Sequence, residues 1–133
     1  MMAGLITAVK QLIVMVEFDD DAPEVNELVL VDNDHDTQLL VDHLDPGGVA
    51  FCLNLRGDLR LSKGMAVKRT QKGLEIPIGE PTVGRILSAL GDPLDGGEAL
   101  AVDSPRKDIF QLPASSTDFK VAKPEILETG IKV

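Results

Sequence analysis

One stretch separates two kinds of sequence in this chain: residues 79–96, Gly-Glu-Pro-Thr-Val-Gly-Arg-Ile-Leu-Ser-Ala-Leu-Gly-Asp-Pro-Leu-Asp-Gly. It has the start and stop signals of a short helix, because proline is tolerated in the first helical turn and glycine is favoured just past a helix end. With Pro81 in the first turn, Gly91 as the stop and Pro93 behind it, the pattern predicts a helix over residues 82–91. Its apolar residues would share one helical face, and they are Val83, Ile86, Leu87 and Leu90.

The sequence before this stretch alternates between apolar and polar residues, as β-strands do. Turn sequences interrupt it at close intervals, among them Asp45-Pro46-Gly47-Gly48 and Arg56-Gly57-Asp58. We expect strands at residues 5–10, 12–18, 27–31, 38–44, 49–55 and 65–70, with an extended piece to residue 78. Shared strand faces are predicted for Leu12, Val14, Val16 and Phe18, and for Val49, Phe51, Leu53 and Leu55. Six short strands favour a mainly β fold with a closed antiparallel barrel, because closure removes exposed strand edges.

The sequence after residue 97 is loose and has little periodicity. It carries Pro105, Pro113 and Pro124 and the run Ser115-Ser116-Thr117. We expect an extended strap over residues 98–123 with room for one short strand. Residues 125–133 end without a cap or a polar tail, as a chain cut within an element would.

Composition and charge exclude several classes of function. The 133 residues are 44% hydrophobic, enough for the core of one compact domain with a tail, and the aromatic residues are four Phe. The net charge of −9 argues against binding to nucleic acid, which requires clustered Lys and Arg, and against binding to an anionic membrane surface.

Cysteine content and the N-terminal sequence bear on the cellular compartment. Cys52 is the only cysteine, so an intrachain disulfide is impossible, and its apolar surroundings predict a small buried side chain. Neither a signal peptide nor an Arg-rich transit peptide pattern opens the sequence. The apolar run at residues 12–16 is too short to span a bilayer. We therefore expect a reducing compartment and membrane association through partners alone.

Several residue groups resemble functional sites, but each fits a structural role better. Asp32, Asp34 and Asp36 have the spacing of the first ligands in a calcium loop, yet Thr37 and His43 occupy the positions where that loop needs Gly and Glu. We interpret the three aspartates as a solvated hairpin tip. His35 and His43 lack a second Cys or His at zinc spacing.

Candidate catalytic groups are equally weak. Asp19 to Asp21 are three adjacent carboxylates in a predicted loop, where they are usually solvated, and Ser115-Ser116 lacks the Gly-x-Ser-x-Gly context of a hydrolase. Arg56-Gly57-Asp58 is interpreted as a turn. The chain also lacks the Gly-x-x-x-x-Gly-Lys-Ser/Thr sequence that cradles nucleotide phosphates, so Arg85 is predicted to be a structural ion-pairing or capping residue and not an arginine finger. No catalytic, cofactor-binding or metal-binding residue is predicted.

Three blocks carry a resemblance to a known family. Residues 79–87, 90–96 and 125–133 resemble the catalytic beta subunit of F-type ATP synthases, in the order and at about the spacing of that family. Residues 32–58 match loosely, and Phe110-Gln111-Leu112-Pro113-Ala114 stands where the family usually carries His-Arg-x-Ala-Pro. The alpha subunit, the vacuolar-type A subunit and secretion ATPases share part of the pattern, but residues 125–133 favour beta.

The resemblance implies a fold and a role. Residues 1–79 would form the N-terminal six-stranded barrel, and residues 80–133 the short helix, the strap and the start of a nucleotide-binding domain without its phosphate loop. The full-length parent would make ATP from ADP and phosphate with Mg, driven by protons or sodium ions. This piece would be inactive by itself and would help to assemble a ring of alternating alpha and beta subunits.

The resemblance also implies partners and a location. Alpha subunits would flank the barrel on both sides, and central-stalk subunits would contact other parts of the parent, on the cytoplasmic face of the bacterial inner membrane. The isolated piece is expected to be a monomer or to self-associate weakly. A different reading of the same residues is a free-standing small-barrel binding module for oligonucleotides or a protein partner.

Overall fold

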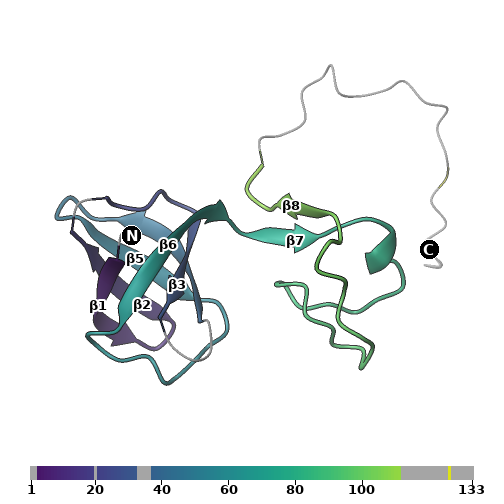
Figure 1. The fold of residues 1–133 in the computed structure, drawn as a ribbon, viewed down its shortest axis with the longest axis horizontal. Helices are drawn as coiled ribbons and strands as arrows, with labels where there is room; N and C mark the ends of the chain where they lie inside the picture. Colours follow the sequence, from purple (N-terminus) through teal and green to yellow (C-terminus); the bar gives the residue numbers. More distant parts are fainter. Residues whose placement is uncertain (1–2, 20, 33–36, 112–125, 127–133) are drawn as a thin grey trace, which may run out of the picture.

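The computed structural model describes residues 3–19, 21–32, 37–111 and 126, and it is mainly β (Figure 1). Within these residues, six antiparallel strands close into a barrel in the order β1-β2-β5-β4-β3-β6. The barrel strands are β1 (Ala3–Lys10), β2 (Ile13–Phe18), β3 (Glu27–Val31), β4 (Gln38–Leu44), β5 (Val49–Asn54) and β6 (Ala66–Gly73). The closed six-stranded barrel expected from the sequence is confirmed.

The core fills the barrel with side chains from alternate positions. On β2, Val14, Val16 and Phe18 point inward, whereas Glu17 is exposed. Leu12 does not join them, because the chain turns at Gln11, whose φ is 55°, and leaves Leu12 outside the strand and 55% exposed. The buried hydrophobic cluster comprises Ile6, Val14, Val16, Phe18, Val29, Val31, Leu39, Val41, Ala50, Cys52, Leu61 and Val67.

Strand β5 places its large side chains on the outside. Ala50 and Cys52 are fully buried, and they lie opposite Val16 and Val14 of β2. The expected apolar face of Val49, Phe51 and Leu53 is therefore the outer face, while Leu55 lies beyond the end of the strand. A six-stranded barrel has room for few bulky residues, so small side chains on β5 complement the valines of β2. The predicted burial of Cys52 is confirmed.

A second, smaller sheet follows the barrel. Strand β7 (Glu75–Pro77) pairs antiparallel with β8 (Arg106–Asp108), which is the one short strand allowed for in the strap. In Figure 1 the chain passes from β6 directly into β7, and the sheet lies beside the barrel. Predictions for residues 112–125 and 127–133, including the rest of the strap, fall outside the described residues.

The predicted helix over residues 82–91 is wrong. The only helical turn among the described residues is η1, a 3-10 turn at Glu80–Thr82. Gly84 follows with φ at +73°, a left-handed conformation that breaks a helix. Beyond it the chain forms a tight hairpin: Leu87 bridges Pro93, and the Leu94 amide donates to the Ile86 carbonyl at 2.8 Å. None of the helices in the described part of the chain is long and apolar enough to cross a membrane.

Candidate functional site

The motif stretch is held together by an arginine. Arg85 donates from Nε to Asp95 Oδ2 at 2.6 Å and from Nη2 to Asp95 Oδ1 at 3.1 Å, and Nη2 also donates to the Glu98 carbonyl at 2.8 Å. The guanidinium crosses directly over Gly97, where a Cβ atom would lie 2.6 Å from Nη2. These hydrogen bonds raise the pKa of Arg85 and lower that of Asp95. Arg85 is therefore engaged in a structural ion pair, as the sequence predicted.

A buried charged cluster closes one end of the barrel. The Glu27 carboxylate accepts hydrogen bonds from Arg69 Nε at 3.0 Å and Nη2 at 2.7 Å, and from the backbone amides of Glu24 and Gln71 at 3.0 and 2.9 Å. The Arg69 side chain is 11% exposed and also contacts the carboxylate of Asp21. Burial alone would raise the pKa of Glu27, but the bonds from Arg69 and the two amides outweigh it and lower the pKa.

The cluster ties three chain segments together. Asp21 belongs to the connection between β2 and β3, Glu27 begins β3 at a β-bulge, and Arg69 lies on β6. Asn26 and Gln71 beside it have left-handed backbones, with φ of 70° and 56°. Such conformations cost energy in residues other than glycine. The Gln71 amide donates to Glu27 Oε1 at 2.9 Å, and the Asn26 amide donates to the Val41 carbonyl at 2.8 Å, so hydrogen bonds hold both backbones in place.

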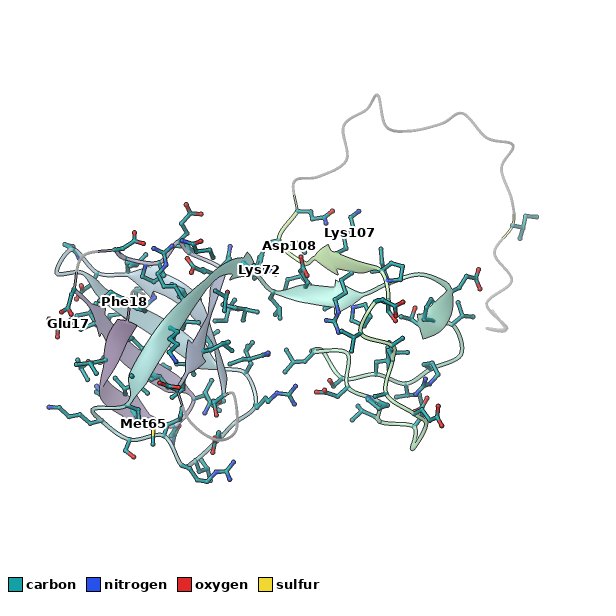
Figure 2. The ribbon with its side chains drawn as sticks, viewed as in Figure 1. Glu17, Phe18, Met65, Lys72, Lys107 and Asp108 are labelled. Atoms are coloured by element: carbon teal, nitrogen blue, oxygen red, sulfur yellow. The ribbon has the colours of Figure 1, made fainter. Side chains whose placement is uncertain are left out.

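Two hollows lie near the junction of the barrel and the β7–β8 sheet. The first, about 410 Å³, borders the charged cluster and is lined by Lys72, Asp108 and Phe110 among others. Figure 2 shows Lys72 and Asp108 together at this junction. A Cβ atom on Gly73 would lie 2.1 Å from Asp108 Oδ2, so only glycine allows the Asp108 side chain to pack there.

The second hollow, about 370 Å³, separates the outer face of β3 from the hairpin. Its apolar lining comes from Leu28 and Leu30 on the barrel and from Leu90 and Leu100 across the gap. At its edge Arg56 forms an exposed ion pair with Asp92, with Nη1 and Oδ2 3.1 Å apart. This ion pair joins the barrel to the hairpin.

The remaining candidate residues have structural roles where the structure describes them. Asp58 accepts hydrogen bonds from Arg60 and Thr37, which lower the pKa of its carboxyl group. Arg56 and the left-handed Gly57 lie in the turn that follows β5, where the Gly57 amide donates to the Asn54 carbonyl at 3.4 Å. His43 stacks on Phe51 with ring centroids 4.5 Å apart. Asp20, Asp34, His35, Asp36, Ser115 and Ser116 lie outside the described residues.

Several arginines of the described residues are engaged in ion pairs. The arginines at 56, 69 and 85 are each paired with a carboxylate, which leaves these guanidinium groups poorly placed to bind phosphate. Within the same part of the chain, no group of three His, Cys, Asp or Glu side chains could hold a metal ion.

The comparison with known proteins finds a relative of this chain. No protein-family model matches the chain. A curated relative, ATP synthase subunit beta 2 of Gluconobacter oxydans (strain 621H), is 37% identical over 135 residues, and the alignment covers 98% of this chain. The chain is a homologue of the N-terminal part of an ATP synthase beta subunit. The resemblance carried by the motif blocks is thereby confirmed, and the chain spans only 27% of the length of that ATP synthase subunit.

Proposed function

We propose that this chain is the N-terminal assembly module of a catalytic ATP synthase beta subunit. The proposal rests on an alignment and a fold. The alignment with a beta subunit covers 98% of this chain, and strands β1 to β6 of the chain form a closed barrel. The barrel domain would comprise residues 1–79, and residues 80–133 would begin the nucleotide-binding domain.

The full-length parent would make ATP from ADP and phosphate by rotary catalysis coupled to ion flow. ATP, ADP and Mg would be bound outside this chain, since its sequence contains no phosphate loop. The module would act at the cytoplasmic face of the bacterial inner membrane as a peripheral part of the complex, with alpha subunits on both sides. Central-stalk subunits would contact other parts of the parent.

Barrel closure supports an assembly role that depends on side chains. Each of the six described barrel strands is paired on both sides, so a partner cannot add a strand to the barrel itself. Contacts with neighbouring subunits would instead use outward-facing side chains and loops.

The test of the proposal is a binding experiment with the 133-residue chain and the N-terminal domain of an alpha subunit. Size-exclusion chromatography with light scattering is expected to show a complex of the two. Failure of the folded proteins to associate at high micromolar concentration would overturn the assembly role. Calorimetry with millimolar MgATP is expected to show no saturable binding to the chain, and clear saturation would overturn the claim that the module is inactive.

A further inference from the structure

The connection between β6 and β7 has a hollow on each side. Lys72 and Gly73 line both the hollow of about 410 Å³ beside the charged cluster and the hollow of about 370 Å³ beneath the hairpin. Figure 2 shows Lys72 at the point where the chain leaves the barrel. Protein interiors are close-packed, so a connection with free volume on both sides is not fixed by its surroundings. Gly73 also has no side chain to wedge the connection, and hinges often use small residues.

Beyond this connection, residues 74–111 form an arm that is held together by its own contacts. Within the arm, β7 pairs with β8, and the Leu74 carbonyl accepts a hydrogen bond from the Ile109 amide at 3.0 Å. The hairpin packs on β7 so closely that a Cβ atom on Gly91 would lie 2.6 Å from Pro77 Cδ. The sheet and the hairpin are therefore expected to move as one body.

Few interactions hold the arm to the barrel. Between two described residues, the Arg56–Asp92 ion pair is the only ion pair or hydrogen bond that joins residues 3–73 to the arm. The hollow between the two bodies is lined from both sides by apolar side chains, which are Leu28, Leu30, Leu90 and Leu100. Because a hollow separates these side chains, little apolar burial opposes a separation of the arm from the barrel.

The Arg56–Asp92 ion pair lies where it can control this separation. Arg56 follows β5 on the barrel, Asp92 belongs to the hairpin, and both line the hollow between the two bodies. Arg56 Nη1 lies 3.1 Å from Asp92 Oδ2, and Nη2 donates to Oδ1 at 3.3 Å. The two side chains are 46% and 48% exposed, so solvent ions reach the pair. Breaking it would leave the arm attached to the barrel through the chain at Gly73.

We propose that the arm rotates on the barrel about Gly73 and that the Arg56–Asp92 ion pair is the latch that keeps it closed. An exposed pair contributes up to about 1 kcal/mol, which corresponds to about a fivefold change in the ratio of open to closed arms. The Debye length falls from about 30 Å at 0.01 M salt to about 3 Å at 1 M, so salt should open the arm. This rotation is a property of the chain by itself and does not depend on the assembly function.

The test measures the distance between the barrel and the arm by pulsed electron paramagnetic resonance. Spin labels are attached through Ser62→Cys in the loop between β5 and β6 and Ala89→Cys in the hairpin, both at exposed positions, in a Cys52→Ala background. Arg56→Gln removes the latch. Lys68→Gln is the matched control, because it also removes one positive charge from a 46% exposed ion pair, but one that lies within the barrel. Circular dichroism verifies that each variant is folded.

With Arg56 intact, we expect one narrow distance at about 0.01 M salt and at least a twofold larger long-distance population at about 1 M. Arg56→Gln should show the long distances already at low salt, and Lys68→Gln should not. Distances that change neither with salt nor in Arg56→Gln would overturn the hinge. A broad distribution at low salt with Arg56 intact, or an equal change in Lys68→Gln, would overturn the latch. The salt comparison needs no change at Arg56, so it decides the question even if Arg56→Gln fails to fold.

Discussion

Glu27 and Arg69 show how a charged pair can be tolerated at the end of a small core. The Glu27 side chain is 5% exposed, yet its carboxylate receives hydrogen bonds from Arg69 and from the amides of Glu24 and Gln71. A fully bonded buried ion pair is roughly neutral for stability, but removing one partner leaves the other charge uncompensated. The intact pair therefore adds little to the free energy of unfolding, whereas removing either partner would lower it.

Replacing Glu27 with Gln should destabilise the barrel by about 3 kcal/mol at neutral pH, because Arg69 loses the carboxylate that it binds most extensively. Interaction with Arg69 and the amides lowers the folded-state pKa of Glu27 below the usual 4.5. Its stabilising contribution is thus present above about pH 4.5 and is lost as the pH falls through the folded-state pKa. Urea denaturation at pH 7 and about pH 3 should show the difference between wild type and variant shrinking in acid.

Lys68→Ala provides the control for that measurement. Lys68 and Asp32 form an exposed pair, with side chains 46% and 57% accessible, and such pairs contribute about 0–1 kcal/mol. Two results would contradict the role assigned to the buried cluster. One is a loss of stability in Glu27→Gln that is no larger than the loss in Lys68→Ala. The other is a loss in Glu27→Gln that is the same at pH 7 and at about pH 3.

Cys52 should be unreactive in the folded chain. Its side chain is fully buried, and burial raises the pKa of the thiol to about 12. A thiol reagent at pH 8 is expected to label the native chain only at the rate of unfolding and to label it at once in urea, with Cys52→Ala as the unlabelled control. Since the folded-state pKa is raised above 9.0, the contribution of the thiol is lost as the pH rises from about 9 toward 12. Rapid labelling of the native protein at pH 8 would show that β5 opens readily.

At the scale of elements, the hairpin at residues 86–94 depends on local hydrogen bonds that a periodic pattern does not reveal. Asp95 Oδ2 accepts from the Ile86 amide at 3.3 Å, and Ser88 Oγ accepts from the Leu90 and Asp92 amides at 3.2 and 3.0 Å. Short polar side chains of this kind compete with helical hydrogen bonding. The apolar spacing that suggested a helix leaves Val83 71% and Ile86 64% exposed in the described structure.

Gly91 and Gly96 offer a matched pair of substitutions in this element. Both have left-handed backbones, with φ of 87° and 71°, so alanine should cost about 1 kcal/mol at either position. At Gly91 a Cβ atom would also lie 2.6 Å from Pro77 Cδ, whereas at Gly96 it would meet no atom within 4 Å.

We therefore expect Gly91→Ala to separate the hairpin from β7 and Gly96→Ala to leave it in place. The Ser88 and Leu94 amides donate to the Asp92 and Ile86 carbonyls within the hairpin. Their hydrogen exchange should be at least tenfold faster in Gly91→Ala than in Gly96→Ala. Equal exchange in the two variants would show that Pro77 does not hold the hairpin.

Prediction from sequence succeeded for the alternating pattern of the barrel strands and failed for the hairpin and for the buried cluster. Val14, Val16 and Phe18 could be assigned to one face of β2 because alternation follows directly from strand geometry. Glu27 and Arg69 are 42 residues apart and belong to no motif, so the buried cluster was missed. A signal did exist: both charges occupy inward positions, Glu27 in line with Val29 and Val31, and Arg69 in line with Val67.

For the whole molecule, the distribution of buried residues predicts two levels of stability. Apart from Leu74, the buried hydrophobic residues of the described chain lie between Ile6 and Val67, within the barrel. Val102, by contrast, is 97% exposed in a segment with few hydrogen bonds. Limited proteolysis should first cut within residues 98–104 and leave a resistant fragment containing β1 to β6. Mass spectrometry identifies the cut, and a first cleavage inside a barrel strand would contradict the prediction.

The pairing that closes the barrel joins the two ends of the domain, with Ala3 opposite Lys68. A ribosome must therefore synthesise almost the whole domain before β1 can pair with β6, which takes roughly 3 to 14 seconds at the usual speeds of translation. Until then β1 has an open edge, and the nascent chain is exposed to mispairing with other chains. For this protein, the period during synthesis is more hazardous than any time after the barrel has closed.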